Sequence, residues 1–165
     1  MRYLTSEAGA IGCANWLRTH NYHHVMNPVE VKISNKVFHY TISTEEEKFY
    51  VLYKHDFFYT FPDKYKEFFA KYPNLNSAGE SINFDRLIWA LNNNYTLIFV
   101  YESGIFYEIK PQEILNVHLL AKEFYENGFI REQDRVNREI QEGFETHIKE
   151  RTVSFPVKAM SRRLE

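Results

Sequence analysis

The chain has 165 residues, of which 44% are hydrophobic and 25% are charged, and its formal net charge is −2 at pH 7. These values fit one folded domain over 1–165 and exclude a wholly disordered chain. The near-neutral charge provides no overall basic field, so any contact with DNA or RNA would need a local basic patch. The single cysteine excludes an internal disulfide and a zinc site built from cysteines.

Targeting and cofactor motifs are absent from the sequence. No apolar run approaches the ~20 residues that span a membrane, and the first residues lack the apolar stretch of a secretory signal. The glycine-rich motifs that bind nucleotide phosphates are also missing. We therefore expect a cytoplasmic protein with no membrane span and no nucleotide cofactor.

A narrow stripe of small apolar residues predicts the first helix, from near Glu7 to Asn21, after Thr5 and Ser6 as capping residues. The stripe consists of Ala10, Cys13, Ala14 and Leu17. Small residues allow a helix to lie close to a sheet, and Cys13 on this stripe is interpreted as a packed core thiol.

Period-two alternation of apolar and polar residues predicts three strands after this helix. The predicted strands are 29–33, 38–42 and 48–54. Aromatic residues dominate the next stretch, 57–79, where Tyr65, Phe68, Phe69 and Tyr72 fall on one helical face. A base-stacking surface would use the same residues, but the pattern favours a core helix, with a loop following over 73–79.

The second half of the chain shows both periodicities again. Helical spacing predicts a helix over 84–91 and another from Pro111 to Asn127-Gly128, and apolar runs predict strands over 95–101 and 105–109. From 130 to 150, acids and bases interleave around a thin apolar stripe of Ile140, Phe144 and Ile148, which we interpret as an exposed charged helix. A short strand over 152–155 and a terminal helix after Pro156 complete the prediction.

These elements predict an α+β fold with a mixed central sheet and helices packed on it. The expected organisation is an αβββαβ core over 1–110, with an aromatic helical insertion at 57–79, and a helical C-terminal extension over 111–165.

Acidic and basic residues occur on the first predicted helix and on several of the predicted strands. Glu7 stands on the first helix, and Glu30-Val31-Lys32 is a Glu-x-Lys on the first strand. Lys54 ends the third strand, where Leu52 stands two residues earlier, and Glu108-Ile109-Lys110 is a second Glu-x-Lys. Carboxylates hold Mg²⁺ or Mn²⁺ through oxygen, and a lysine can orient the attacking water.

This element order resembles the PD-(D/E)XK nuclease superfamily, the restriction-endonuclease-like fold that includes archaeal Holliday-junction resolvases. The resemblance implies a catalytic set of Glu7, Glu30, Lys32 and Lys54, with Glu7 and Glu30 as metal ligands in an active enzyme. The chain departs from the motif, because Leu52 stands where an acid is expected and no aspartate lies between Glu7 and Asp56.

Three hypotheses for function follow from these residues. The first is a degenerate nuclease-like domain that binds DNA or RNA without catalysis, through Lys32, Lys54, Arg162 and Arg163. The second is an interaction or self-association module that presents Ile140, Phe144 and Ile148 to a partner or a second copy. The third is an active metal-dependent endonuclease. The histidines His20, His23, His24 and His39 lack the spacing of a zinc site and are interpreted as polar residues of turns and strands.

Overall fold

The computed structural model describes residues 2–33, 36–55, 58–138 and 145–165. In this part of the chain the strands form a six-stranded sheet of order β1-β2-β3-β5-β6-β9 and a three-stranded sheet of order β4-β8-β7. The strands of the large sheet are β1 (Val29–Ile33), β2 (Lys36–Ser43), β3 (Lys48–Lys54), β5 (Thr96–Tyr101), β6 (Phe106–Ile109) and β9 (Arg162–Leu164).

The large sheet is mixed. β1, β2 and β3 form an antiparallel meander, while β3 and β5 are parallel, with Lys54 opposite Tyr101. A parallel pair needs a crossover connection, and the chain supplies one that contains the helix α3 (Phe84–Asn92). The predicted order of helix, three strands, helix and strand is therefore present, and the α+β class with a mixed central sheet is confirmed.

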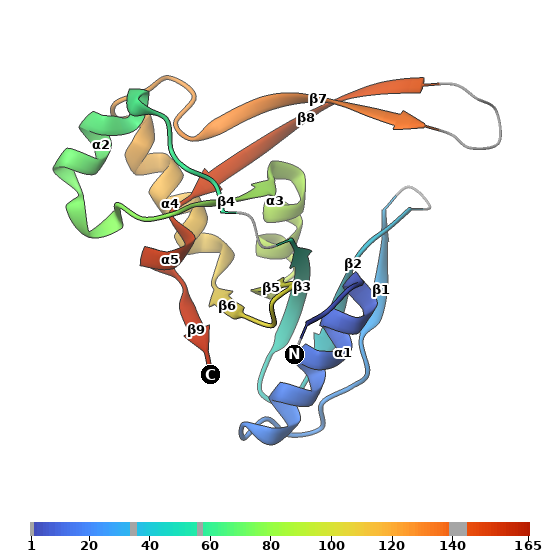
Figure 1. Ribbon diagram of the computed structural model, residues 1–165. Coiled ribbons are helices and arrows are strands. Elements are labelled where there is room, and N and C mark those ends of the chain that lie inside the picture. The colour runs from blue at the N-terminus through green and yellow to red at the C-terminus, as the bar shows by residue number, and fades with distance from the viewer. Residues whose placement is uncertain (1, 34–35, 56–57, 139–144) are drawn as a thin grey trace.

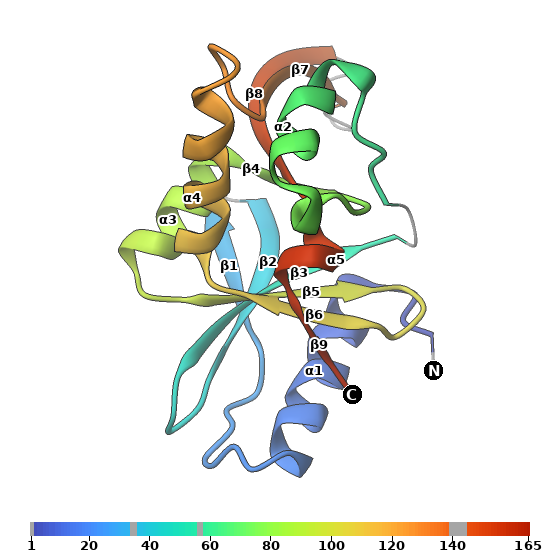
Figure 2. The ribbon, with the colours of Figure 1, turned by 90° about the vertical axis from the view of Figure 1, so that its left-hand side faces the viewer.

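Helices cover both faces of the large sheet (Figures 1 and 2). α1 (Ser6–Thr19) packs on one face, and α3 and α4 (Pro111–Lys122) pack on the other. The apolar side chains form two core clusters as a result, one on each face of the sheet. We call these faces the α1 face and the α3 face.

The small-residue stripe of α1 confirms the predicted close packing. Thr5 Oγ1 caps the helix by accepting from the amide of Ala8 at 3.1 Å, and Cys13 and Leu17 are fully buried. Burial raises the pKa of the Cys13 thiol to about 12. The thiol therefore stays protonated and acts as a core side chain.

The aromatic insertion is helical and belongs to the core on the α3 face. It contains η1 (Asp63–Tyr65), α2 (Lys66–Lys71) and η2 (Pro73–Leu75). Phe68 is fully buried, and its ring meets the rings of Phe69 and Phe129 edge-on at 5.3 Å and 5.0 Å. This edge-to-face geometry is a favourable one for aromatic pairs, and it confirms that the aromatic stripe forms core.

The small sheet contains β4 (Glu80–Asn83), β8 (Glu145–Phe155) and β7 (Ile130–Arg138). β4 pairs only with residues 152–155 of β8, whereas β7 pairs along the whole length from 145 to 153. In the described chain, residues 145–151 of β8 therefore pair with β7 alone. We call this two-stranded segment the ribbon, and it extends well beyond the rest of the molecule (Figure 1).

The predicted helix over 130–150 is wrong, because 130–138 and 145–150 belong to the strands β7 and β8. The interleaved charges that suggested i, i+4 pairs lie opposite one another across the two strands instead, which stabilises a sheet in the same way. Among the residues with described side chains, the oppositely charged partners in the register are Glu132 with Arg151 and Asp134 with Lys149.

The prediction of a helical C-terminal extension over 111–165 is therefore also wrong for the residues after α4. After Pro156 the chain makes one helical turn, α5 (Val157–Met160), and then adds β9 to the edge of the large sheet. Leu164 is 7% exposed and packs into the core on the α1 face. Burial of this leucine favours a strand here over a continuing surface helix.

The β1–β2 hairpin forms a second projection. β2 pairs with β3 only over Tyr40–Ser43, so that its earlier residues pair with β1 alone. In Figure 1 this hairpin and the ribbon project on the same side of the molecule.

Candidate functional site

A cluster of polar side chains lies on the α3 face where the parallel strands β3 and β5 end. Lys54, the last residue of β3, donates through Nζ to the carbonyl oxygen of Ser81 at 2.8 Å and lies 3.6 Å from Glu80 Oε1. Tyr101, the last residue of β5, donates through its hydroxyl to Glu80 Oε2 at 2.9 Å. Glu80 is only 6% exposed, so these donors stabilise a buried carboxylate.

Arg86 and His39 form the second half of this cluster. Asn83 Oδ1 caps α3 by accepting from the amides of Asp85 and Arg86 at 2.9 Å and 3.2 Å, which places Arg86 in the first turn of the helix. Its guanidinium Nη1 lies 3.2 Å from His39 Nε2 on β2. A guanidinium only donates hydrogen bonds, so Nε2 accepts and the ring proton sits on Nδ1.

The electrostatics keep His39 neutral. Burial, together with the charges of Arg86 and Lys54, lowers the pKa of His39 to about 3. The lone pair of the neutral ring is engaged by Arg86, so His39 is not available as a general base.

Tyr50 lies beside His39, with the two rings edge-on at 5.3 Å. Its hydroxyl is buried without a hydrogen-bond partner in the described part of the chain, and burial raises its pKa to about 12. A buried polar atom without a partner is uncommon in folded proteins and calls for an explanation. We define the polar cluster as His39, Tyr50, Lys54, Glu80 and Arg86.

The predicted metal-binding acids lie on the other side of the sheet. The hydroxyl of Tyr40 donates to Glu30 Oε1 at 3.4 Å. Burial raises the pKa of Tyr40, and the charges of Glu30 and Glu7 raise it further. Tyr40 packs in the core on the α1 face, whereas Lys54 binds Glu80 on the α3 face.

The structure thus brings Glu7 and Glu30 toward each other but separates both of them from Lys54 by the sheet. Leu52, at the position where the nuclease motif has an acid, is 1% exposed and packs in the core on the α3 face. In the described chain, no three His, Cys, Asp or Glu residues are arranged to hold a metal ion.

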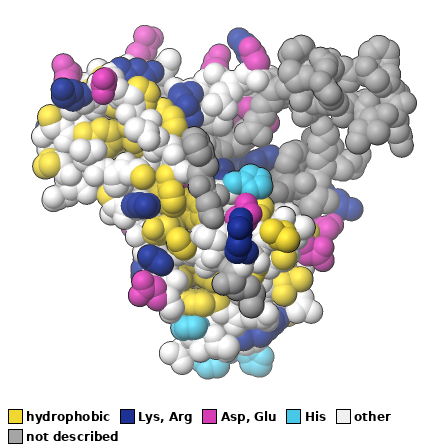
Figure 3. Space-filling model, in the orientation of Figure 1, with side chains coloured by type: hydrophobic (Ala, Val, Ile, Leu, Met, Phe, Trp, Pro, Cys, Tyr) yellow, Lys and Arg dark blue, Asp and Glu magenta, His cyan; other side chains and the backbone are white. Residues whose placement is uncertain are grey.

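Lys32 lies on the exposed surface of the β1–β2 hairpin, next to a bulge between Val31 and Lys32. A bulge turns the strand and re-aims the side chains beside it. Lys32 makes no hydrogen bond or ion pair with any residue that the structure describes. Figure 3 shows Lys and Arg side chains in the recess between the part of the molecule that carries the small sheet, at the top, and the part that carries the large sheet, below it.

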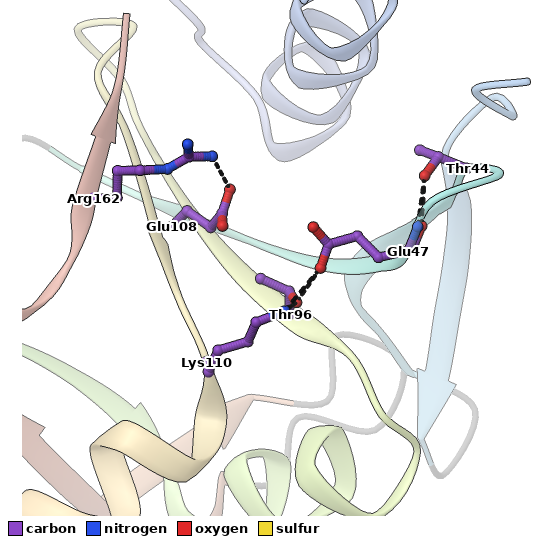
Figure 4. A network of polar contacts seen from close by, with 6 residues as sticks. All are labelled: Thr44, Glu47, Thr96, Glu108, Lys110 and Arg162. Atoms are coloured by element: carbon purple, nitrogen blue, oxygen red, sulfur yellow. Dashed lines mark hydrogen bonds and ion pairs between the residues drawn. The ribbon is translucent and has the colours of Figure 1, made fainter. Parts of the chain in front are cut away.

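The second Glu-x-Lys has a structural role at the opposite end of the sheet, where β3 and β5 begin (Figure 4). Lys110 Nζ donates to Glu47 Oε2 at 2.9 Å and to Thr96 Oγ1 at 2.7 Å. Glu108 accepts from Arg162 Nη2 at 2.9 Å. The acid and the lysine of this motif thus belong to two separate ion pairs. Glu108 connects the neighbouring strands β6 and β9, and Lys110 connects the end of β6 to the start of β3.

Arg162 and Arg163, predicted to bind nucleic acid, lie on β9 at the edge of the large sheet. Arg162 is paired with Glu108, and Arg163 Nε lies 3.6 Å from Glu165 Oε1. The structure therefore places both arginines next to acids and away from the polar cluster, which lies on other strands.

The predicted interface residues give no helical stripe. Ile140 and Phe144 lie outside the described residues, and Ile148 lies in β8, opposite Arg135 of β7. In the part of the chain that the structure describes, no helix is both long and apolar enough to cross a bilayer.

Comparisons with known proteins do not assign this chain to a family. No family model, no curated protein and no solved structure matches the chain. The candidate site therefore rests on the chemistry of the residues themselves.

Sequence reasoning found Lys54 but missed its partners. Glu80 follows a stretch of turn-forming residues, and Arg86 precedes the apolar positions of α3, so neither stands out as chemically special. Nothing in the sequence distinguishes His39 from the other histidines. A pairing between residues 47 positions apart leaves no signal in a single sequence.

Proposed function

We propose that this chain binds nucleic acid with the side of the molecule from which the β1–β2 hairpin and the ribbon project, and that it does so without hydrolysing it. The observation that carries this proposal is the ribbon itself. An uncovered two-stranded antiparallel segment is only marginally stable in water, so a polar ribbon of this length is best explained by a partner that orders it.

The shape and composition of the ribbon favour nucleic acid as that partner. The major groove of B-form DNA admits a two-stranded β-ribbon, and several DNA-binding proteins read a groove with strands. β7 and the 145–151 part of β8 contain four arginines and one lysine against four acids, and few apolar residues. Such a surface suits contacts to phosphates more than burial in a protein interface.

Cations near the base of the two projections support the same function. Lys32 is exposed on the hairpin, and Lys54 and Arg86 are held on the α3 face by Glu80 and His39. Glu80 offsets the charge of Lys54, so Lys32 and Arg86 supply the local positive charge that the net charge of −2 does not provide. The separation of Glu7 and Glu30 from Lys54 favours binding over metal-dependent cleavage, so the nuclease resemblance is proposed at the level of a degenerate domain.

Fluorescence anisotropy with labelled duplex, branched and single-stranded oligonucleotides tests this proposal. We expect binding that weakens with salt, because phosphate contacts release counterions. Lys32→Ala should weaken binding uniformly across sequences and reduce the slope of log K against log [salt] by about one. The matched control is Lys66→Ala, an exposed lysine of α2 on the far side of the molecule from the hairpins (Figure 1).

Absence of binding to all three substrates at low salt would contradict the proposal, and so would equal effects of the Lys32 and Lys66 substitutions.

Light scattering on the same samples examines the second candidate, self-association. The outer edge of β7 has no strand partner in the described chain, and a free edge can pair with a second copy. A mass that rises with protein concentration, without oligonucleotide binding, would favour that candidate. The cytoplasmic location stays a prediction from the sequence.

A further inference from the structure

A small cavity lies where the end of α4 meets the two strands β7 and β8. Its volume is about 260 Å³, and its lining includes His118 and Lys122 of α4 and Arg151 of β8. None of these residues belongs to the polar cluster. The cavity therefore calls for an explanation of its own.

His118 is the buried donor of this cavity. The residue is only 4% exposed. Its Nδ1 accepts a hydrogen bond from the amide of Phe129 at 3.2 Å. Because Nδ1 accepts, the proton of the neutral ring sits on Nε2. No hydrogen-bond partner of Nε2 is present in the described part of the chain.

The backbone at Gly128 holds the His118 ring in this orientation. Gly128 has a φ of +54°, and a Cβ atom at this position would lie 2.5 Å from the ring. Only glycine combines this left-handed conformation with so close an approach. The ring is thus fixed between Gly128 and the Phe129 amide, with Nε2 left as the free donor.

Two cations line the same cavity from different elements. Lys122 follows His118 by one helical turn, so both side chains lie on one face of α4, and its charge contributes to lowering the pKa of His118 after the larger effect of burial. Arg151 is half-exposed, with its guanidinium 4.8 Å from the Phe84 ring and 3.9 Å from Asp85. The imidazole stays neutral and donating in this environment.

Two carboxylates also line the cavity, and both are exposed. Glu132 is 61% exposed and lies 3.7 Å from Lys149 Nζ, while Glu126 lies on the surface after α4. The buried interior of the cavity thus offers a donor, and the exposed rim carries both signs of charge. A ligand of modest negative charge suits this arrangement better than a highly charged one.

We propose that this cavity binds a small oxyanion group, with His118 Nε2–H as the buried donor and with Lys122 and Arg151 as the cations that neutralise it. Charge-assisted hydrogen bonds from a guanidinium and an ammonium to an oxyanion are among the strongest in proteins. The shared chemistry fits a carboxylate or a phosphate. This inference does not depend on the proposed nucleic-acid binding, since it uses other residues.

The test is an NMR titration of the full chain that follows the imidazole resonances of His118, with inorganic phosphate in one arm and acetate in the other. We expect saturable shifts in at least one arm, and the arm that responds identifies the class of oxyanion. Lys122→Ala should weaken the binding roughly tenfold, as the loss of one charge-assisted contact implies. Lys122 is exposed, so the variant is expected to fold.

Lys66→Ala, on the surface of α2, serves as the matched control and should bind like the unaltered chain. Gly128→Ala probes the fixed ring by a second route and should also weaken binding, with folding checked by circular dichroism. The inference is overturned if neither anion shifts the His118 resonances, or if Lys122→Ala and Lys66→Ala bind equally well.

Discussion

Single residues of the polar cluster carry a measurable pH signature. In the folded chain the pKa of His39 is about 3, whereas the pKa of a histidine in an unfolded chain is near 6.5. As the pH falls below ~6.5, the unfolded chain takes up a proton that the folded chain refuses. The contribution of His39 to stability is therefore complete above this pH and is lost as the pH falls toward 3.

We expect this effect to reduce the free energy of unfolding by roughly 2–3 kcal/mol between pH 7 and pH 4.5, from about 1.4 kcal/mol for each pH unit below 6.5. Urea denaturation across this range measures it, with His39→Gln as the comparison because glutamine cannot titrate. The variant should lose stability less steeply with acid. Parallel curves for the two proteins would show that His39 does not have the lowered pKa.

Two buried tyrosines on adjacent strands allow a matched comparison of hydroxyl groups. Tyr101 donates to the buried Glu80, whereas the Tyr50 hydroxyl lacks a partner in the described chain. Removing a donor from a buried carboxylate costs about 1–3 kcal/mol, while removing an unpaired hydroxyl of unchanged ring shape is nearly neutral or stabilising. Thermal and urea denaturation should show that Tyr101→Phe is destabilised and that Tyr50→Phe is not.

The Tyr50 comparison also reports on function. A stable Tyr50→Phe with weaker oligonucleotide binding would show that this buried hydroxyl acts on binding indirectly, through the neighbouring His39. If Tyr50→Phe instead loses as much stability as Tyr101→Phe, then the hydroxyl has a partner in solution and its place in the polar cluster needs another explanation.

At the level of elements, the ribbon differs from the rest of the small sheet in the number of strands that pair with β8. Residues 152–155 of β8 pair with β4, and 152–153 pair with β7 as well; Val153 and Phe155 are fully buried. Residues 145–151 have only one neighbouring strand, β7. Local stability follows burial and hydrogen-bond partners, so one strand should contain two regions of different stability.

Amide hydrogen exchange followed by NMR or mass spectrometry measures this difference. We expect amides over 145–151 to exchange much faster than those over 152–155 in the free protein. A bound oligonucleotide should slow exchange in the ribbon, because ordering by a partner suppresses local opening. Equal protection along the whole of β8, unchanged by oligonucleotide, would contradict both the marginal stability of the ribbon and its role in binding.

At the scale of the whole molecule, the sheet separates the acids from the lysine that the nuclease resemblance brings together. Glu7 and Glu30 lie near Tyr40 on the α1 face, and Lys54 is bound to Glu80 on the α3 face. Divalent cations need several oxygen ligands at one point. Two exposed carboxylates alone provide too few oxygen ligands to bind a divalent cation tightly.

Calorimetric titration with Mg²⁺ and Mn²⁺ should therefore show no saturable binding at micromolar concentrations, and an oligonucleotide incubated with the protein and either cation should remain intact. Glu30→Gln serves as the comparison. Cleavage that needs the cation and is lost in Glu30→Gln would contradict the separation of these residues and restore the enzyme hypothesis.

Local side-chain patterns determined much of this fold. The stripe of Ala10, Cys13, Ala14 and Leu17 fixed α1, and alternation fixed β1, β2 and β3, because each pattern belongs to one segment and has one favourable way to bury its apolar side. The fully apolar run of β5 determined a buried strand for the same reason. These elements together required the α+β class.

The segment over 130–155 shows where local patterns fail. Its opposite charges can pair along a helix or across two strands at similar gain, so the charges do not decide between the two structures. The burial of Val153 and Phe155 against β4 decides it, because these contacts join segments about seventy residues apart. The polar cluster arises in the same way, since Arg86 reaches His39, and Glu80 reaches Lys54, only after α3 and β4 pack above the sheet. Tertiary packing thus placed the residues of the candidate site, while local patterns in the sequence determined the strands β2 and β3 that carry His39, Tyr50 and Lys54.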